Sequence, residues 1–370
     1  MKIVFLSNFF NHHQKPFSDE LYLLNSDYHF IETMNVPAEQ KAMGYEIKNI
    51  PTYVENLLKN RNRCLQFIDD ADVIIFGSAP EILLDNAKKT KKIIIRYSER
   101  PLRHGIELLK YIPRLIKWHY HNPFKCPIYM LCSSAFTASD YRKFGLFKKK
   151  TYKWGYFTAV KEYLNVQNLI EKKKKHSIIW VARFLKLKHP EYVVELAKYL
   201  KEKKYSFEIE MIGSGEQESI IKQLVQENQL SDNIHMLGLM PPEKVREHME
   251  QSEIFIFTSD QQEGWGAVMN ESMNSACAVV ADSRIGSVPF LIQNGVNGFA
   301  YSNKKEFFER VEQLLLCDEL RKKISINAYM TILNDWSPKI AASRFLKLSE
   351  CLIESGNCDC FENGPCSRAV

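Results

Sequence analysis

Long apolar runs are absent from this 370-residue sequence. None approaches the roughly 20 residues that a membrane-spanning helix requires, and the amino end shows no charged-then-apolar leader. An even number of cysteines is also lacking, because the chain has nine, and no export signal accompanies them. We therefore expect reduced thiols in a cytoplasmic protein rather than a disulfide framework. The length allows two domains, each with its own core.

A strong net charge is missing too, but the charge of +6 is unevenly distributed. Residues 91–160 hold 15 Lys and Arg against 3 Asp and Glu. This excess predicts a polyanionic partner, which is an anionic membrane, a phosphorylated acceptor or a nucleic acid. Within it, residues 104–120 mix basic, aliphatic and aromatic residues, as in a contact at lipid headgroup level or in an amphipathic helix packed on a sheet. Pro113 is expected to kink or divide any helix there.

The most informative stretch is residues 253–282. It predicts a buried strand at 254–257, a polar loop with two glycines, a helix at 267–275 and a second strand at 278–281. Units of this kind bind ligands at the carboxyl ends of their strands. The backbone N–H groups at the glycine turn, 264–268, would face an anion such as phosphate.

Two carboxylates bracket this turn, Glu263 before it and Glu271 inside the helix. A carboxylate accepts two hydroxyl hydrogen bonds, which suits a vicinal diol on a sugar. The helical rise from Gly266 to Glu271 is roughly 7–8 Å, about the span of a diphosphate. We therefore expect one glutamate at a sugar and the other at a ribose, with solvated surface glutamates as the alternative.

The segment EGWGAVMNESMN, residues 263–274, resembles the E-x7-E signature of the retaining, nucleotide-sugar-dependent glycosyltransferases of family 4. The usual form is E-G-F-G-x4-E-A-M-A, so Trp265 and Ser272 are mild departures. The resemblance implies an α/β protein of the GT-B fold, in which two Rossmann-like domains with parallel sheets face each other across a cleft. It also implies retention at the anomeric carbon.

A second match follows the strand predicted at 177–182. Arg183 and Lys188 stand where a strand passes into a helix, and such cations clamp a diphosphate by charge-assisted hydrogen bonds. The segment ARFLKLKH, residues 182–189, resembles the family's G-R-x4-K-G, with alanine and histidine in place of its glycines. Further on, Gly213-Ser214-Gly215 resembles the family's V-G-x-G turn.

The resemblance assigns roles to these positions. Glu263 would hold the donor sugar and Glu271 the ribose, while Arg183 and Lys188 would neutralise the diphosphate. The expected catalytic residues are Glu263, Arg183, Lys188 and Glu99. The expected donor-binding residues are Glu271, Gly264, Trp265, Gly266, Ala267 and Val268, with Leu239 and Met240 in a loop that lies against the nucleobase in the family.

The amino-terminal half carries weaker signals. His12 and His13 follow the first predicted strand, where family members often have a glycine-rich loop that this chain lacks. We expect them to contact the acceptor or a phosphate, with hydrogen-bonded loop histidines as the alternative. Ser98 and Glu99 follow another strand, about where family members keep a histidine near the reacting sugar, and Ser98 is expected on the acceptor or phosphate side.

Glu99 also has a purely structural interpretation, namely charge neutralisation by Arg96, Arg100 and Arg103.

Metal sites are not expected. Asp70-Ala71-Asp72 resembles the D-x-D motif of the other glycosyltransferase fold, but it precedes its strand instead of following it. We therefore expect no cofactor, only the nucleotide-diphosphate sugar as co-substrate. The carboxy-terminal cysteines lack the usual zinc-knuckle spacing, which favours a frayed end; they are Cys351, Cys358, Cys360 and Cys366.

The predicted layout has four parts. An acceptor-side domain covers 1–162, a nucleotide-sugar-binding domain covers 163–336, a helix at 337–356 returns to the first domain, and a flexible Cys-rich tail covers 357–370. The basic segment 160–176 is the candidate interdomain linker.

The predicted function is hexosyl transfer, with a UDP-sugar as a candidate donor, to a glycan or lipid-linked acceptor. The pathway class is synthesis of capsule, exopolysaccharide or lipopolysaccharide. The protein would contact the anionic inner face of the plasma membrane peripherally, and no nucleic acid. The alternatives are a non-catalytic basic module that binds anionic lipid or nucleic acid, and a same-fold epimerase or glycan phosphorylase; for the phosphorylase, a lysine-anchored cofactor signature is missing.

Overall fold

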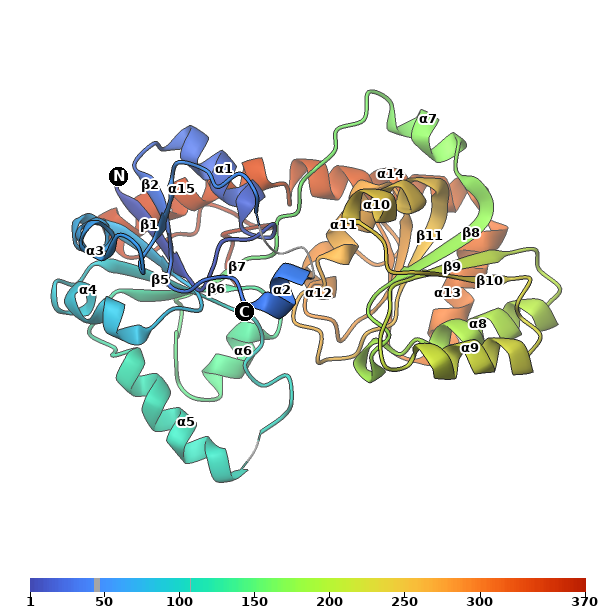
Figure 1. Cartoon of the computed structure of the whole chain (residues 1–370), viewed down its shortest axis with the longest axis horizontal. Helices are drawn as coiled ribbons and strands as arrows, with labels where there is room; N and C mark the ends of the chain where they lie inside the picture. The colour runs from blue at the N-terminus through green and yellow to red at the C-terminus, as the bar shows by residue number, and fades with distance from the viewer. Residues whose placement is uncertain (43–46, 107) are drawn as a thin grey trace. The chain divides into compact units, whose positions relative to one another are not determined.

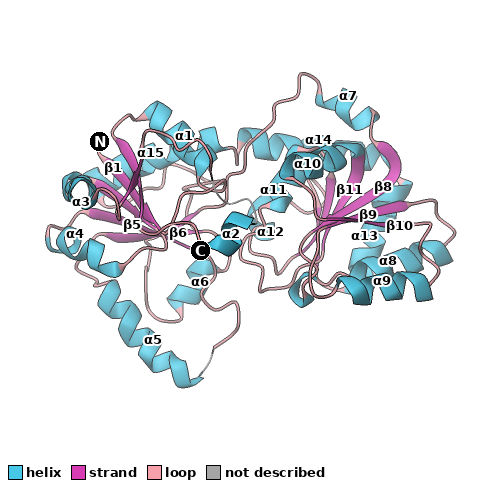
Figure 2. Ribbon diagram, in the orientation of Figure 1, coloured by secondary structure: helices cyan, strands magenta, loops and turns pink. Residues whose placement is uncertain are grey.

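The chain forms two α/β units in the computed structural model, which describes residues 1–42, 47–106 and 108–370. Unit 1 comprises Met1–Ala159 and Trp336–Val370, and unit 2 comprises Val160–Asp335. Each unit has a parallel sheet with helices on its faces (Figure 1; Figure 2). This is the α/β class with two parallel sheets that the sequence predicts. Glu107, within the segment 104–120, lies outside the described residues.

Unit 1 contains a seven-stranded sheet in the order β3-β2-β1-β4-β5-β6-β7, with every neighbouring pair parallel. Most of its strands are buried apolar runs, because helices cover both faces of a parallel sheet. The strands are β1 (Ile3–Ser7), β2 (Tyr28–Glu32), β3 (Val54–Asn56), β4 (Val73–Phe76), β5 (Ile93–Ser98), β6 (Ile128–Cys132) and β7 (Thr151–Lys153). The helices are α1 (Lys15–Leu24), α2 (Ala38–Ala42), α3 (Arg61–Asp70), η1 (Glu81–Leu84), α4 (Asp85–Lys89), α5 (Leu108–His121), α6 (Thr137–Arg142) and α15 (Pro338–Ser355).

Helix α5 differs from its prediction. Pro113 lies inside it without dividing it. Proline removes one backbone donor and crowds the preceding turn, but Pro113 is only the sixth residue of the helix, so that turn is the first. Among the described residues, no helix is long and apolar enough to cross a membrane.

The carboxy-terminal segment is ordered on unit 1, so the prediction of a flexible tail is wrong. Helix α15 packs against α1 and ends at Gly356, whose φ of +70° is a left-handed cap. Beyond it, the backbone N–H of Lys153 in β7 donates to the Ser367 carbonyl at 2.7 Å. Cys366 is also buried. The tail therefore provides hydrogen-bond partners for the backbone of β7, an edge strand whose polar groups would otherwise be unpaired.

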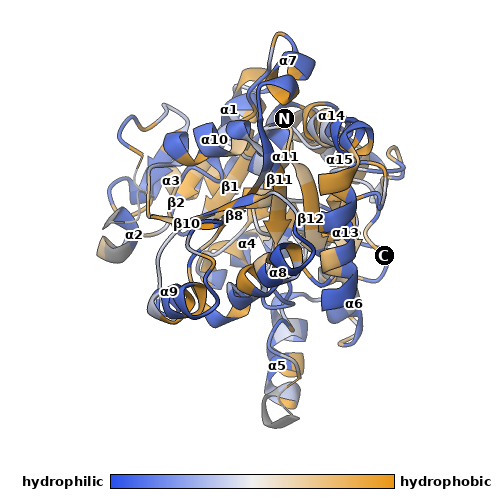
Figure 3. Cartoon of the chain, turned by 90° about the vertical axis from the view of Figure 1, so that its right-hand side faces the viewer, coloured by the Kyte–Doolittle hydropathy of each residue, from blue (hydrophilic) through white to orange (hydrophobic). Residues whose placement is uncertain are grey.

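Unit 2 contains a six-stranded parallel sheet in the order β10-β9-β8-β11-β12-β13. Its strands are β8 (Lys174–Val181), β9 (Glu208–Ile212), β10 (Ile234–Gly238), β11 (Ser252–Phe257), β12 (Ala278–Asp282) and β13 (Phe299–Tyr301). Its helices are α7 (Val166–Glu171), η2 (Lys186–Lys188), α8 (Glu191–Glu202), α9 (Glu218–Glu227), α10 (Pro242–Gln251), α11 (Val268–Asn274), α12 (Val288–Leu291), α13 (Lys304–Leu316) and α14 (Asp318–Asn334). The central strands are hydrophobic and the outer faces of the helices are mostly hydrophilic (Figure 3).

The segment 160–176 belongs to unit 2, so its prediction as a linker is wrong. It contains α7 and the beginning of β8. Lys173 is 6% exposed, and its ammonium donates to the carbonyls of Ser252 at 2.8 Å, Ser275 at 2.9 Å and Met249 at 3.0 Å. A run of lysines resembles a solvated loop in sequence, but three acceptors compensate the burial of this one.

Candidate functional site

The carboxyl ends of β8 and β11 bring two predicted residues together. These strands are adjacent and parallel, so the loops that follow them meet at one edge of the sheet. Lys188, at the end of η2, forms an ion pair with Glu263 from the loop after β11. Their side chains are 14% and 15% exposed. Each charge is thus neutralised by the other while both remain accessible to a ligand.

Hydrogen bonds hold the backbone around this pair. The Thr258 hydroxyl donates to the Lys188 carbonyl at 2.6 Å, and the Trp180 indole N–H donates to that hydroxyl at 2.9 Å. The Asp260 N–H donates to the Leu187 carbonyl at 3.0 Å. The loops after β8 and β11 are therefore joined at two points, which fixes the position of Lys188.

The departures from the family's glycine pattern can be judged from the backbone. His189 stands where the family has the last glycine of G-R-x4-K-G, and it adopts the left-handed φ of +46° that glycine favours. Its ring is held by Glu191 at 2.7 Å and Asp260 at 3.5 Å, which raises the pKa of His189. The two carboxylates thus favour the protonated form of His189, which follows Lys188 in the chain.

Glycine is required after β9. A Cβ at Gly213 would lie 2.0 Å from the Ala182 carbonyl oxygen, and one at Gly215 would lie 2.6 Å from the Phe184 carbonyl oxygen. Both residues also have positive φ. The turn therefore approaches the segment that carries Arg183. Arg183 itself is exposed, and no ion pair or hydrogen bond of its guanidinium is found among the described residues.

In the glycine turn, Gly266 is held close to Phe257 and the Trp265 side chain packs inward. Gly266 has a φ of +79°, and a Cβ there would lie 2.3 Å from the Phe257 ring. The Trp265 side chain is buried, and its indole N–H donates to the Asn270 amide oxygen at 2.9 Å. Of the predicted donor-binding residues, Trp265 can therefore contact a ligand only through its backbone. The roles of Gly264, Ala267 and Val268 stay predictions.

Glu271 lies in α11, and burial raises the pKa of its carboxyl group, while Arg246 opposes that shift. No hydrogen bond to this carboxylate is found within the described ranges, whereas Glu263 has Lys188. Glu271 is half-buried, so the part of its carboxylate that is removed from water gains from a hydrogen-bond donor. The site therefore gains if a ligand brings hydroxyl donors to Glu271. Leu239 and Met240 lie in the loop between β10 and α10, with Leu239 exposed.

Unit 1 gathers a second group at the carboxyl ends of β1 and β5. The ring of His13 stacks on Tyr156 with centroids 5.5 Å apart, and His12 lies 4.0 Å from His13. The Tyr156 hydroxyl donates to the Glu99 carboxylate at 2.5 Å. Burial and His12 lower the pKa of His13 to about 3, so the imidazole is neutral at physiological pH. Ser98 donates its hydroxyl to the Glu99 carbonyl at 2.7 Å.

Tyr156 is the residue that sequence reasoning missed. It follows the short strand β7 and belongs to no motif, so only its position after a strand could have indicated it. Burial raises the pKa of Tyr156 well above its usual value. It therefore stays a protonated hydrogen-bond donor that links the predicted histidines to Glu99.

The expected charge neutralisation of Glu99 is wrong for two of its three arginines. Arg96 makes two hydrogen bonds to Glu81, at 2.7 and 2.9 Å. Arg100 pairs with Asp140 at 3.0 Å. Arg103 contacts Glu99 at 3.4 Å.

The D-x-D-like segment lies at the amino ends of the strands of the same sheet. The Lys2 ammonium pairs with Asp70 at 3.2 Å, and the Lys2 N–H donates to Asp72 at 2.8 Å. Both contacts are at the amino ends of β1 and β4. These carboxylates thus pair with Lys2 at the amino ends of the strands, whereas the other predicted residues of unit 1 lie at the carboxyl ends.

A comparison with family models gives one match, in unit 2. Residues 164–331 match the family model described as "Glycosyl transferases group 1", which covers most of this unit.

Two curated relatives cover part of the chain. The amylovoran biosynthesis glycosyltransferase AmsK of Erwinia amylovora is 28% identical over 127 residues, which are 33% of this chain and 31% of AmsK. Spore coat protein SA of Bacillus subtilis is 24% identical over 159 residues, which are 40% of this chain and 42% of that protein. The chain thus spans less than half the length of these relatives.

Solved structures match nearly the whole chain. TarM superposes with a TM-score of 0.71 at 11% identity, covering 96% of this chain and 99% of TarM. Anabaena Alr3699/HepE in complex with UDP gives a TM-score of 0.70 at 12% identity, covering 95% and 100%. At these identities the likeness shows the fold, which is GT-B, as the sequence predicts.

Proposed function

We propose that the protein is a retaining hexosyltransferase of family 4 that moves a sugar from a nucleoside-diphosphate sugar to a glycan or lipid-linked acceptor. Three observations support this beyond the fold. The E-x7-E segment lies inside the region that matches the group 1 family model. Relatives of part of the chain include proteins named for amylovoran and colanic acid biosynthesis, which favours surface polysaccharide synthesis. A structural neighbour was solved with UDP and glucose, which favours a UDP-sugar donor.

The Lys188–Glu263 pair is the observation that carries the proposal. A donor diphosphate would accept hydrogen bonds from Lys188 and Arg183, and the released Glu263 would accept from hydroxyls of the donor sugar. The bond from the anomeric carbon to the diphosphate oxygen then breaks, and its electron pair stays on that oxygen. The acceptor hydroxyl oxygen bonds to the anomeric carbon, and its proton passes to the departing phosphate. Positive groups already in place stabilise that leaving group.

The direct test is slow hydrolysis of a sugar nucleotide in the absence of acceptor. A panel of nucleotide sugars is first screened by thermal shift, because a ligand that binds only the folded state raises the midpoint. The donor that raises it most is then followed for release of nucleoside diphosphate. Release by the wild type and its loss in Glu263→Gln support the transferase. Equal release by both would reject this site.

Metal independence is a separate part of the proposal. Asp70 and Asp72 are engaged by Lys2 at the amino edge of the unit 1 sheet, and cationic side chains take the metal's usual place at the phosphates. Activity should persist in excess EDTA. Complete loss that manganese or magnesium restores would contradict it.

Helix α5 supports peripheral contact with an anionic membrane. Ile112, Ile116 and Tyr120 recur every fourth residue and are 65%, 65% and 79% exposed. The other side of the helix packs on unit 1, where Trp118 lies 4.6 Å from Phe144 between ring centroids. An exposed apolar row flanked by cations is typical of helices that lie in the interface plane. Figure 3 shows hydrophobic positions along α5.

Vesicle flotation tests this contact. The wild type should bind vesicles with anionic lipid more than neutral ones, and binding should fade with salt. Ile112→Glu/Ile116→Glu should reduce it. Ile220→Glu, an exposed isoleucine on α9 of unit 2, is the matched control and should bind as the wild type does. Equal binding to neutral vesicles, or an equal loss in the control, would contradict the proposal.

A non-catalytic basic module is the second candidate, because the same surface would serve it. It gives no role to Glu263 and Glu271, so it predicts no hydrolysis of sugar nucleotides by the wild type. Binding to nucleic acid would also show a steep salt dependence.

A further inference from the structure

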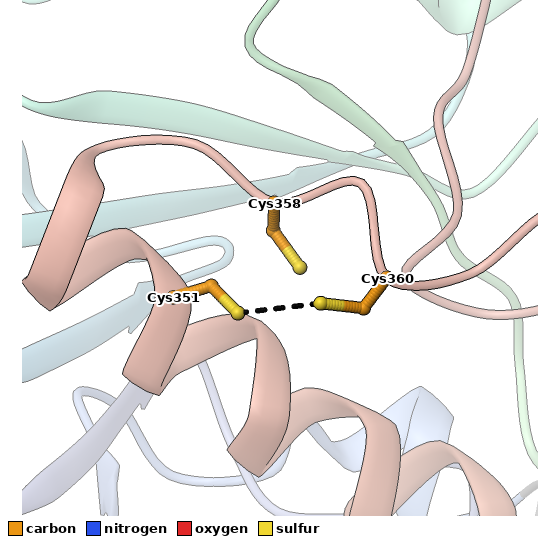
Figure 4. A group of neighbouring side chains, drawn as sticks. All are labelled: Cys351, Cys358 and Cys360. Atoms are coloured by element: carbon orange, nitrogen blue, oxygen red, sulfur yellow. Dashed lines mark hydrogen bonds between the residues drawn. The ribbon is translucent and has the colours of Figure 1, made fainter.

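The tail brings three cysteines together on unit 1. Cys351 lies in the last turn of α15, and Cys358 and Cys360 lie just beyond Gly356. Their Sγ atoms all lie within 4.8 Å of one another. Figure 4 shows the three thiols directed toward a common point. All three are free cysteines, and the donor-binding residues proposed above lie in unit 2.

The spacing of the sulfur atoms fits a tetrahedral metal ion. Zinc binds thiolates at about 2.3 Å, which places neighbouring sulfurs about 3.8 Å apart. The Sγ atoms of Cys351 and Cys360 are 3.5 Å apart. Soft thiolate ligands select zinc over magnesium or calcium. The C-x6-C-x-C spacing is unusual in sequence, but the helix cap at Gly356 turns the chain back so that the thiols converge.

The segment that carries two of these cysteines is held by its own contacts. The Cys358 N–H donates to the Tyr152 hydroxyl at 3.2 Å. The guanidinium of Arg368 donates to the Asp359 carboxylate at 2.6 Å, and Asn357 donates to the same carboxylate at 2.7 Å. These contacts orient the thiols before any ion binds, as outer-shell partners do in metal sites.

The net charge of the bound site would be small. Three thiolates around one Zn²⁺ carry a net charge of −1. Lys347 lies one turn before Cys351 on α15, where its ammonium pairs with Glu350 at 3.4 Å and also lies within electrostatic range of Cys351 and Cys360. Cys360 is exposed, so solvent reaches the ion from that side. Cys366 is buried and lies outside the group.

We propose that Cys351, Cys358 and Cys360 bind one Zn²⁺ ion, with water in the fourth position, and that the ion fastens the tail to the end of α15. Binding displaces the thiol protons to solvent and involves no redox change. The ion would close the short loop from 351 to 360. It would thereby stabilise the segment that covers the edge of β7, without taking part in sugar transfer.

Zinc titration of the full chain tests this. The protein is kept reduced with a non-thiol reductant, stripped with a chelator and titrated with Zn²⁺ against a chromophoric competitor. The wild type should bind one ion per chain. Cys360→Ser removes an exposed ligand, so the fold should survive, and zinc should bind at least about tenfold more weakly. The matched control is Cys317→Ser, an exposed cysteine in unit 2, which should bind like the wild type.

Thermal denaturation provides the second measurement. Stripping the metal should lower the Tm of the wild type and of Cys317→Ser, and it should leave the Tm of Cys360→Ser unchanged. Zinc uptake that Cys360→Ser does not weaken would overturn the proposal. It would equally fail if the purified chain contained a Cys351–Cys360 disulfide and took up no zinc after reduction.

Discussion

Both units have a parallel sheet covered by helices, but they differ in the side chains that lie at the carboxyl ends of their strands. In unit 2 these strand ends hold opposite charges: Lys188 pairs with Glu263, and no donor to Glu271 is found in the described part of the chain. In unit 1 two neutral side chains lie beside one carboxylate, because burial keeps His13 unprotonated and Tyr156 protonated. Glu99 accepts the Tyr156 hydroxyl.

This difference follows from what each edge would bind. A diphosphate is highly charged and becomes more so as it departs, so cations are needed where it lies. A sugar hydroxyl is neutral, and uncharged donors and acceptors hold it at less desolvation cost. The same sheet architecture thus supports two kinds of site, and the following experiments separate them.

The largest effect is expected at Lys188. Lys188→Met should lower kcat/KM about a hundredfold or more, because one transition-state donor contributes about 2.7–4 kcal/mol. Arg183→Ala should lose at least tenfold, about 1.4 kcal/mol. Lys186→Met changes an exposed lysine of the same turn and should be near wild type. If Lys186→Met loses as much kcat/KM as Lys188→Met in steady-state kinetics, the Lys188–Glu263 pair is not part of the active site.

The two glutamates of unit 2 should separate in calorimetry with nucleoside diphosphate. Glu271 is assigned to the ribose, which the product retains, whereas Glu263 is assigned to the sugar, which it lacks. Glu271→Gln should bind at least about tenfold more weakly, since a hydrogen bond to a charged group contributes about 1.5–3 kcal/mol. Glu263→Gln should bind like the wild type. The reverse order would mean that the donor lies the other way across the glycine turn.

A smaller effect is expected in unit 1. Tyr156→Phe removes the donor to the Glu99 carboxylate and should lower transfer to acceptor by about tenfold, the low end of the about 1.5–3 kcal/mol for a hydrogen bond to a charged group. Nucleotide affinity should not change. The control is Tyr205→Phe, which removes a similar bond to Glu312, 2.6 Å long, on unit 2. A loss of nucleotide affinity in Tyr156→Phe would place this group at the donor instead.

A still smaller effect is expected in the pH dependence of nucleotide binding. Burial raises the pKa of Glu271 above its ordinary 4.5, so its carboxylate is protonated at a pH where other glutamates are still charged. Binding should weaken as the pH falls through this raised pKa, and Glu271→Gln should lose that part of the dependence. An unchanged profile in the variant would show that Glu271 does not contact the nucleotide.

The same pKa shift has a consequence for stability. A carboxyl whose folded-state pKa is raised favours the protonated form, so its charge lowers the free energy of unfolding at neutral pH. Glu271→Gln should therefore raise the Tm at pH 7, and the gain should vanish as the pH falls toward the ordinary 4.5. A lower Tm at pH 7 would contradict the assignment of a costly buried charge.

Local pattern was enough to predict much of unit 2. Helix α11 lies within the predicted helix 267–275, and β12 extends the predicted strand by one residue. The sequence assigned Lys188 and Glu263, 75 residues apart, to the same donor, but it did not predict their ion pair. These features are predictable because buried strands and glycine turns carry their constraints in neighbouring residues.

The sequence by itself determined the α/β class, the order of most elements in unit 2 and the residues expected at its charged edge. Only the tertiary structure decided the roles of Lys173, Tyr156 and the tail cysteines. Lysine in a basic run is normally solvated, and three backbone carbonyls from distant elements make Lys173 internal. Tyr156 and Cys358 likewise acquire their partners from strands and helices far along the chain. Such contacts depend on which segments pack together, which periodicity within a segment does not encode.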